Sequence, residues 1–222
     1  MSRQIFWIVM ATAVAITFVV PHQSIQADIP PQTFNTPSSV KYSLSARESK
    51  FMARAYAGGL LWFKGHDHHL AAREFSGDVE LTPETITPAS LRLSVKADSL
   101  VETGSAFTEL QKEIINKEVR ELVLQPDQHP EIVFQSTAAT SKSLGSGQYD
   151  VKLTGNLTLH GVTRTEEIPV RVTLSGDTLR AAGEFSIDRS DYKVKATSAF
   201  HGLVRVRDKV KFEFDIISHR QK

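Results

Sequence analysis

The sequence predicts an all-β fold, an antiparallel barrel of about eight strands with one helix inserted around residues 105–124. Apolar and polar residues alternate over most of the chain from residue 40 onward, and turn residues separate the alternating runs at short intervals. One long segment changes to helical spacing, and a further helical turn is expected around residues 58–63. Because strands with a single apolar face leave open edges unless the sheet closes, we expect a barrel.

Residues 1–27 are expected to precede the folded domain as a secretory signal peptide. A basic start at Arg3 is followed by an uncharged, apolar run over 5–20, which Pro21 ends, and the small residue Ala27 offers a cleavage site. The alternative is an uncleaved anchor, although the run is shorter than the roughly 20 residues that a spanning helix needs. Cleavage would place the protein in the periplasm.

A flexible lead-in over residues 28–39 is expected next, because three prolines stand there among polar residues. No second linker of comparable length follows. We therefore expect a single barrel domain over residues 40–222.

The strands of this domain are predicted from period-two alternation of apolar residues. The turns between them carry Gly, Pro and Asp, and their shortness favours antiparallel neighbours. The alternating runs cover residues 40–44, 51–57, 75–81, 91–95, 132–134, 149–159, 168–174, 185–187, 204–206 and 210–216.

The inserted helix is predicted from apolar residues at helical spacing. Phe107, Leu110 and Ile114 stand at i, i+3 and i+7, and Gln125-Pro126 ends the pattern. Before that end, Val119, Leu122 and Val123 extend the helical spacing. This apolar stripe is expected to pack the helix onto the barrel, where it could also gate one end. The alternative for the same stripe is a face that docks on a membrane.

The barrel interior is expected to hold a ligand, because the early strand carries the small residues Ala53 and Ala55 after Phe51. Glycines within other strands add to this expectation, although they can instead mark bulges or barrel corners. The alternative is a filled core in an envelope stress or interaction module. The predicted apolar cavity residues are Phe51, Ala53, Ala55, Leu91, Leu93, Phe134, Leu153, Leu157, Val172, Phe185 and Phe212.

Composition excludes several classes of function. The chain has 222 residues, with 26 Lys and Arg against 25 Asp and Glu, and this balance argues against a nucleic-acid-binding protein. It has no cysteine, which excludes disulfides, thiolate metal sites and thiol nucleophiles. No common catalytic or phosphate-binding motif is present. We therefore expect neither an enzyme nor a cofactor.

One polar cluster stands out, the run His66-Asp67-His68-His69. Its imidazoles and carboxylate could ligate a transition metal, because alternate residues of an extended segment share a face. A hydrogen-bonded turn at the barrel rim is the simpler interpretation. A third is that a histidine meets the polar head of a bound ligand, and His66, His68 and Arg189 are the candidates for that role.

Five stretches of sequence, in order, resemble the YceI-like family of periplasmic lipid-binding and polyisoprenoid-binding proteins. The resemblance runs from about Tyr42 to Ile217, and its most specific stretch is L-T-L-H-G-V-T at 157–163. The other stretches are G-H-D-H at 65–68 with F-S-G at 75–77, P-E-I-V-F at 130–134, F-S-I-D-R-S-D-Y at 185–192 and V-R-V-R-D-K-V at 204–210.

This resemblance implies a lipocalin-like barrel whose elongated apolar cavity holds an isoprenoid chain, as in a quinone or a polyprenyl lipid. It implies no catalysis. The expected partner is then a small amphiphilic lipid or quinone, with transient contact to a membrane. The histidine-rich rim departs from many relatives and leaves the identity of the ligand open.

Overall fold

The structure is a computed structural model that describes residues 38–87, 89–199, 201 and 203–222. The segment predicted as a signal peptide and nearly all of the predicted lead-in lie outside these residues. In chain order the elements are β1 (Val40–Leu44), β2 (Lys50–Gly58), η1 (Trp62–Lys64), β3 (His68–Ala72), β4 (Phe75–Leu81), β5 (Ala89–Lys96), η2 (Ala97–Ser99), β6 (Leu100–Glu102), α1 (Glu109–Glu118), η3 (Val119–Leu124), β7 (Glu131–Gly145), β8 (Gln148–Leu159), β9 (Val162–Ser175), β10 (Thr178–Asp188), η4 (Arg189–Tyr192), β11 (Ser198–Ala199) and β12 (Val204–Arg220).

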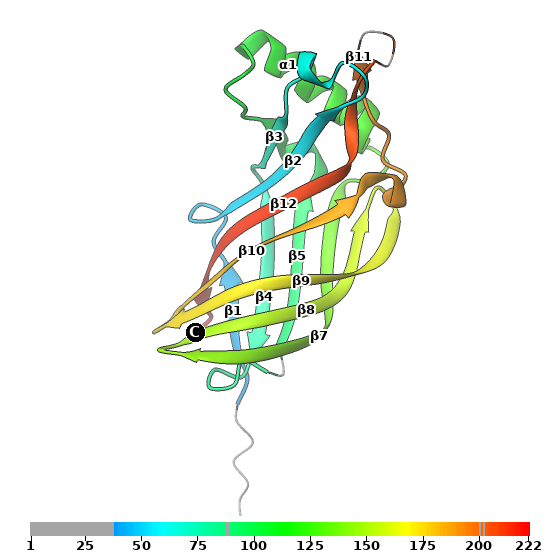
Figure 1. The fold of residues 1–222 in the computed structure, drawn as a ribbon. Helices are drawn as coiled ribbons and strands as arrows, with labels where there is room; N and C mark the ends of the chain where they lie inside the picture. Colours follow the sequence, from blue (N-terminus) through cyan, green and yellow to red (C-terminus); the bar gives the residue numbers. More distant parts are fainter. Residues whose placement is uncertain (1–37, 88, 200, 202) are drawn as a thin grey trace, which may run out of the picture. The chain divides into compact units, whose positions relative to one another are not determined.

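Eight of these strands close into an antiparallel barrel. They follow the order β1-β4-β5-β7-β8-β9-β10-β12, and β1 pairs with β12 to complete the circle, with Tyr42 opposite Arg220. The remaining strands β2, β3 and β6 extend the sheet at one end, where β2 pairs with the first part of β12 (Figure 1). The predicted fold class, a barrel of about eight strands with one inserted helix, is confirmed.

The long strand β12 joins these two regions. One of its edges pairs first with β2, where Phe51 lies opposite Phe214, and then with β1, where Leu44 lies opposite Ser218. Its other edge pairs with β10 over eleven residues. Because side chains alternate along a strand, each second residue of β12 faces the barrel interior. We call the end at α1, β3 and the beginning of β12 the helix end.

The inserted helix begins at Glu109 and continues through a wider π-helical turn, η3, to Leu124. It begins later than predicted because Thr108 is its N-cap: the Thr108 side chain accepts a hydrogen bond from the Gln111 backbone, and the Gln111 side chain accepts one from the Thr108 backbone. Gln125 ends it in the left-handed conformation, with φ of 49°. The predicted end is therefore correct.

Only part of the stripe predicted to pack this helix onto the barrel does so: the Phe107 ring stacks on the His68 imidazole of β3, whereas Leu110 and Ile114 are 69% and 54% exposed. The helix instead faces the barrel with Ile115, Val119 and Leu124, which belong to the core or pack against it. The sequence contains both sets at helical spacing, so only the approach of the barrel selects one of them.

Gly155 shows why one strand glycine is required. A Cβ at this position would lie 2.5 Å from Cζ of Phe134 and 2.6 Å from the carbonyl oxygen of Gln135. The register between β7 and β8 shifts at this point, between Ser136 and Ala138. This glycine therefore serves a bulge with close strand contact rather than adding space for a ligand.

We predict that Gly155→Ala lowers the free energy of unfolding by about 1–3 kcal/mol, because the added methyl group overpacks the contact with the Phe134 ring and the neighbouring backbone. Lys152→Ala on the same strand is the control, since Lys152 is exposed and its ion pair with Glu167 lies on the surface. Urea unfolding measures both variants. Equal stability of Gly155→Ala and the parent protein would contradict the prediction.

Within the described residues, no helix combines the length and the apolar character needed to cross a bilayer.

Candidate functional site

The barrel encloses two cavities that follow each other along its interior. The larger, the upper cavity, has a volume of about 500 Å³ and lies at the helix end, between β2, β12 and the helical segment 109–124. The smaller, the lower cavity, has a volume of about 110 Å³ and is lined almost entirely by apolar side chains. The volume of the upper cavity is typical of small-molecule sites, which span about 300–1,000 Å³.

Every side chain predicted for the ligand site lines one of these two cavities. The upper cavity contains three of the apolar residues and all three candidates for the head group. Its predicted members are Ala53, Ala55, Phe212, His66, His68 and Arg189. The predicted members of the lower cavity are Phe51, Leu91, Leu93, Phe134, Leu153, Leu157, Val172 and Phe185.

Phenylalanine rings line both cavities close to the place where they meet. Phe212 lines the upper cavity, and its ring centroid lies 5.0 Å from that of Phe185 and 6.0 Å from that of Phe51, which both line the lower cavity. Ile132 lines both cavities. These phenylalanine rings therefore lie where the two cavities meet.

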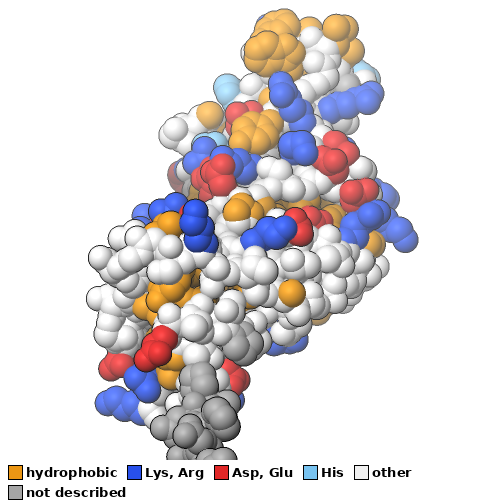
Figure 2. All heavy atoms as spheres, turned by 60° about the horizontal axis from the view of Figure 1, so that its bottom comes forward, with side chains coloured by type: hydrophobic (Ala, Val, Ile, Leu, Met, Phe, Trp, Pro, Cys, Tyr) orange, Lys and Arg blue, Asp and Glu red, His pale blue; other side chains and the backbone are white. Residues whose placement is uncertain are grey.

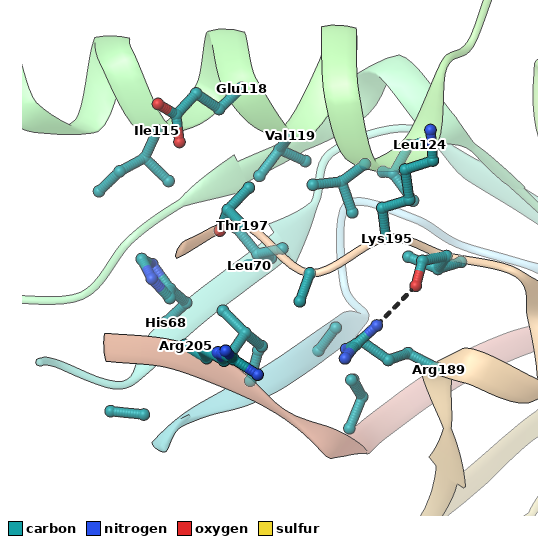
Figure 3. A pocket seen from close by; sticks show the side chains of 18 of the residues that line it. His68, Leu70, Ile115, Glu118, Val119, Leu124, Arg189, Lys195, Thr197 and Arg205 are labelled. Atoms are coloured by element: carbon teal, nitrogen blue, oxygen red, sulfur yellow. Dashed lines mark hydrogen bonds between the residues drawn. The ribbon is translucent and has the colours of Figure 1, made fainter. Parts of the chain in front are cut away.

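The roof of the upper cavity comes from the helical segment. Ile115, Val119 and Leu124 point from it toward the barrel, and Leu70 on β3 lies across the cavity from them (Figure 3). The sequence pattern included Val119 but missed Ile115 and Leu124, because it assigned the packing face to Phe107, Leu110 and Ile114, of which Phe107 and Ile114 also line the cavity. The residues at i and i+4 (Ile115 and Val119) were an equally regular signal for the correct face.

The mouth of the upper cavity is rich in positive charge. Lys195 and Arg205 are exposed and line it together with Lys64 (Figure 3). Arg189 lies deeper and donates a hydrogen bond from Nη1 to the carbonyl oxygen of Val194, at 2.7 Å. Sequence reasoning identified Arg189 but missed the other three, because surface Lys and Arg residues carry no periodic signal.

His68 is held at this mouth by a buried carboxylate. Its Nδ1 lies 2.9 Å from Oε2 of Glu102, whose side chain is fully buried. The imidazole also stacks on the ring of Phe107, with 5.2 Å between centroids and an angle of 9° between planes. These two contacts fix the direction of the imidazole, so His68 presents one preset ring edge to the cavity.

Glu102 is the central polar group beneath the mouth. It accepts hydrogen bonds from the backbone N–H groups of Gly104 and His69, at 2.7 and 3.1 Å. Burial raises the pKa of Glu102, but the hydrogen bonds from His68, Gly104 and His69 outweigh burial and lower the pKa below its ordinary value. The carboxylate is therefore ionised at neutral pH although it is buried.

The structure does not assemble the histidine run into a metal site. The Asp67 carboxylate accepts a hydrogen bond from the backbone N–H of Ala57 at 2.9 Å, and the His66 ring packs edge-on against Phe107. His160, far along the chain from this run, lies beside His129 and Gln125. Among residues 38–87, 89–199, 201 and 203–222, no three His, Cys, Asp or Glu side chains come close enough to share a metal ion.

Comparisons with known proteins agree with this architecture. A family model described as a YceI-like domain matches residues 42–217. BcnA of Burkholderia cenocepacia is 22% identical, with a TM-score of 0.60 over 78% of this chain and 98% of that one. A polyisoprenoid-binding domain from Saccharophagus degradans, implicated in plant cell wall breakdown, is 15% identical, with a TM-score of 0.59 over 82% and 99% of the two chains.

A YceI protein from Campylobacter jejuni is 15% identical, with a TM-score of 0.51 over 68% of this chain and 83% of that one. At these levels of identity the three structures show a shared fold. A search of curated proteins finds no match.

Proposed function

This chain belongs to the YceI-like domain family, and we propose that it is a non-enzymatic carrier that holds an amphiphilic isoprenoid lipid, of the polyprenyl or quinone type, inside its barrel. The upper cavity supports this proposal most directly, because it is a space of about 500 Å³ with apolar walls and a polar, cationic mouth. The apolar walls suit the tail of an amphiphile, and the polar mouth suits its head group. The N-terminal sequence supports the periplasm as the place of action.

The apolar tail would lie between β2 and the roof of Ile115 and Val119, with its end directed at Phe212. Burial of the tail contributes about 0.8 kcal/mol for each CH₂ group before ordering costs. A few prenyl units therefore suffice for micromolar binding. Two small side chains, Ala53 and Ala55, line the upper cavity, and they leave volume there for the tail.

The head group would lie at the mouth, close to His68, Lys195 and Arg205. Ammonium, guanidinium and imidazole N–H groups donate to the oxygens of a phosphate or a quinone carbonyl. The structurally similar domain from Saccharophagus degradans is described as polyisoprenoid-binding, which is consistent with such a ligand here.

The test is native mass spectrometry of the protein isolated from its own cell envelope, followed by organic extraction of what it carries. We expect a co-purifying species with the mass of a prenyl quinone or a polyprenyl lipid, in a ratio of one per chain. A protein that is empty and also fails to take up added prenyl quinone would refute the proposal and favour a barrel that acts through its surface.

A further inference from the structure

Four large apolar side chains are exposed together beside the mouth of the upper cavity. We call this group the apolar tip: it consists of Leu60, Trp62, Phe63 and Leu203, which are 77%, 57%, 63% and 42% exposed. A water-exposed protein surface seldom gathers such residues without a partner. Figure 2 shows hydrophobic side chains at the end of the molecule that lies at the top of Figure 1, with Lys and Arg side chains and some Asp and Glu side chains beneath them.

The tip is a defined structure and not a set of unrelated side chains. The backbone N–H of Leu61 donates to the carbonyl oxygen of Leu203 at 2.9 Å, which joins the β2–β3 loop to the segment before β12. Within this loop, the rings of Trp62 and Phe63 meet edge to face at 6.4 Å. The aromatic residues therefore protrude from a backbone that is anchored at the barrel end.

The two segments that form the tip and its base are basic. Residues 57–66 and 193–207 contain no Asp or Glu, although Asp67 and Asp208 follow them directly and Glu118 lines the upper cavity. Among the described residues, Lys64, Lys193 and Lys195 make no ion pair with a carboxylate. The Lys and Arg residues of the two segments are Lys64, Lys193, Lys195, Arg205 and Arg207.

Exposed Trp, Phe and Leu residues next to a group of Lys and Arg residues match one kind of partner by chemistry. Aromatic side chains favour the interface between lipid head groups and acyl chains, and each basic residue near an anionic bilayer adds about 1 kcal/mol of attraction. A protein partner with an acidic, apolar surface would offer the same negative charge as an anionic bilayer. Such a partner would not explain why the tip adjoins the opening of a lipid-sized cavity.

We propose that the apolar tip inserts into the head-group region of an anionic lipid bilayer and sets the mouth of the upper cavity against the membrane surface. Lys64 and Gly65 follow the tip directly in sequence and line the cavity, as does Val204 on the other side. Insertion would therefore allow a lipid to pass between bilayer and barrel without crossing open water. This inference deepens the proposed function and rests on it for the nature of the cargo, whereas the docking itself is independent of the cargo.

Trp62 in the apolar tip can serve as a fluorescent probe of insertion. The chain has two tryptophans, Trp7 and Trp62, so a Trp7→Phe background leaves Trp62 as the sole tryptophan whether or not residues 1–27 are removed. The protein is isolated from its own cell envelope in this background. It is then mixed with vesicles of phosphatidylcholine alone or of phosphatidylcholine with phosphatidylglycerol.

We expect Trp62 emission to shift to shorter wavelength and to be quenched by brominated acyl chains, with phosphatidylglycerol vesicles only, and we expect added salt to reverse the effect. Leu203→Asp should weaken vesicle binding by about tenfold or more, since it removes an apolar contact and adds a repelled charge. Leu144→Asp is the matched control, because Leu144 is 43% exposed, as Leu203 is, but belongs to the β7–β8 hairpin at the opposite end of the barrel.

Three outcomes would overturn the docking proposal: no shift of Trp62 emission on anionic vesicles, an equal loss of binding in Leu144→Asp, or a Leu203→Asp variant that changes the oligomeric mass of the protein while vesicle binding stays the same. Lipid uptake is measured separately in detergent solution, where Leu203→Asp should bind like the parent protein because Leu203 does not line the cavity. Docking without any bound lipid would refute the carrier function alone, and lipid binding without docking would refute the tip alone.

Discussion

Ala55→Trp should abolish lipid retention while the barrel stays folded. Ala55 lines the upper cavity from β2, opposite His68 on β3 and Val210 on β12 in the sheet. An indole at this position would occupy space that the proposed tail needs. Displacing only three or so CH₂ groups at about 0.8 kcal/mol each already lowers the affinity more than about tenfold, and the cavity itself accommodates the added ring without overpacking the core.

The measurement is the amount of lipid extracted per chain, together with equilibrium uptake of an added prenyl quinone. Ala138→Trp is the matched control, because Ala138 is exposed on β7 and its substitution leaves both cavities unchanged. Circular dichroism and the midpoint of thermal unfolding should be similar for the two variants. Normal lipid content in a folded Ala55→Trp protein would show that the ligand does not occupy the upper cavity.

Glu102→Ala should cause the largest loss of stability of any single change at the mouth, about 3 kcal/mol or more. The buried carboxylate accepts from the backbone N–H groups of His69 and Gly104, and its removal leaves both without this acceptor. Glu102 also connects to the helix, because its own backbone N–H donates to Oδ1 of Asn116 at 2.7 Å. Glu102→Gln, which keeps one acceptor oxygen, should fall between the alanine variant and the parent.

Urea unfolding at neutral pH measures these differences. Glu80→Ala serves as the control, because the ion pair of Glu80 with Lys41 is exposed and spans 3.8 Å, so its loss should change the free energy of unfolding by less than about 1 kcal/mol. If the two alanine variants had equal free energies of unfolding, the hydrogen bonds of Glu102 beneath the mouth would not contribute to stability.

The same carboxylate gives a pH dependence with a defined sign. The folded protein holds the pKa of Glu102 below its ordinary value of 4.5, so the unfolded chain binds the proton more readily. The stability that Glu102 contributes is therefore complete above about pH 4.5 and is lost as the pH falls through the lower pKa of the folded state. The difference in unfolding free energy between the parent and Glu102→Gln should be constant near neutral pH and shrink in acid. A difference that grew in acid would contradict this.

The contacts of His160 could not be predicted from the sequence. It stands in the most family-specific stretch of the chain, yet its role is structural: its Nε2 lies 3.0 Å from Oε1 of Gln125, the residue that ends the helical segment. Burial lowers its pKa below the ordinary value, and His129, with its ring centroid 4.3 Å away, lowers it further. The neighbours are 31 and 35 positions away along the chain, so no local pattern links them.

The interior of the barrel was predictable from the sequence because a strand has a period of exactly two. Once the apolar face is known, each second residue points inward, and so Leu91, Leu157 and Phe185 could be assigned to the interior without any coordinates. Closure into a barrel was favoured by the same pattern, since closing the sheet is the one arrangement that removes its edges altogether. The prediction treated the interior as one cavity, whereas the structure has two neighbouring cavities of different size, with Phe212 in the lining of the larger.

Elements outside the period-two pattern needed the tertiary structure. The helix carries two sets of apolar residues, and local spacing cannot tell Leu110 and Ile114 from Ile115 and Val119; the position of the barrel decides which set is buried. The cationic mouth and the apolar tip likewise join the β2–β3 loop to the segment before β12, more than a hundred residues away. By itself the sequence determined the sheet, its inward face and the apolar interior, because these follow from local alternation. The tertiary structure alone decided the division of the cavity, the face of the helix and the composition of the mouth, because each depends on contacts between segments that are distant along the chain.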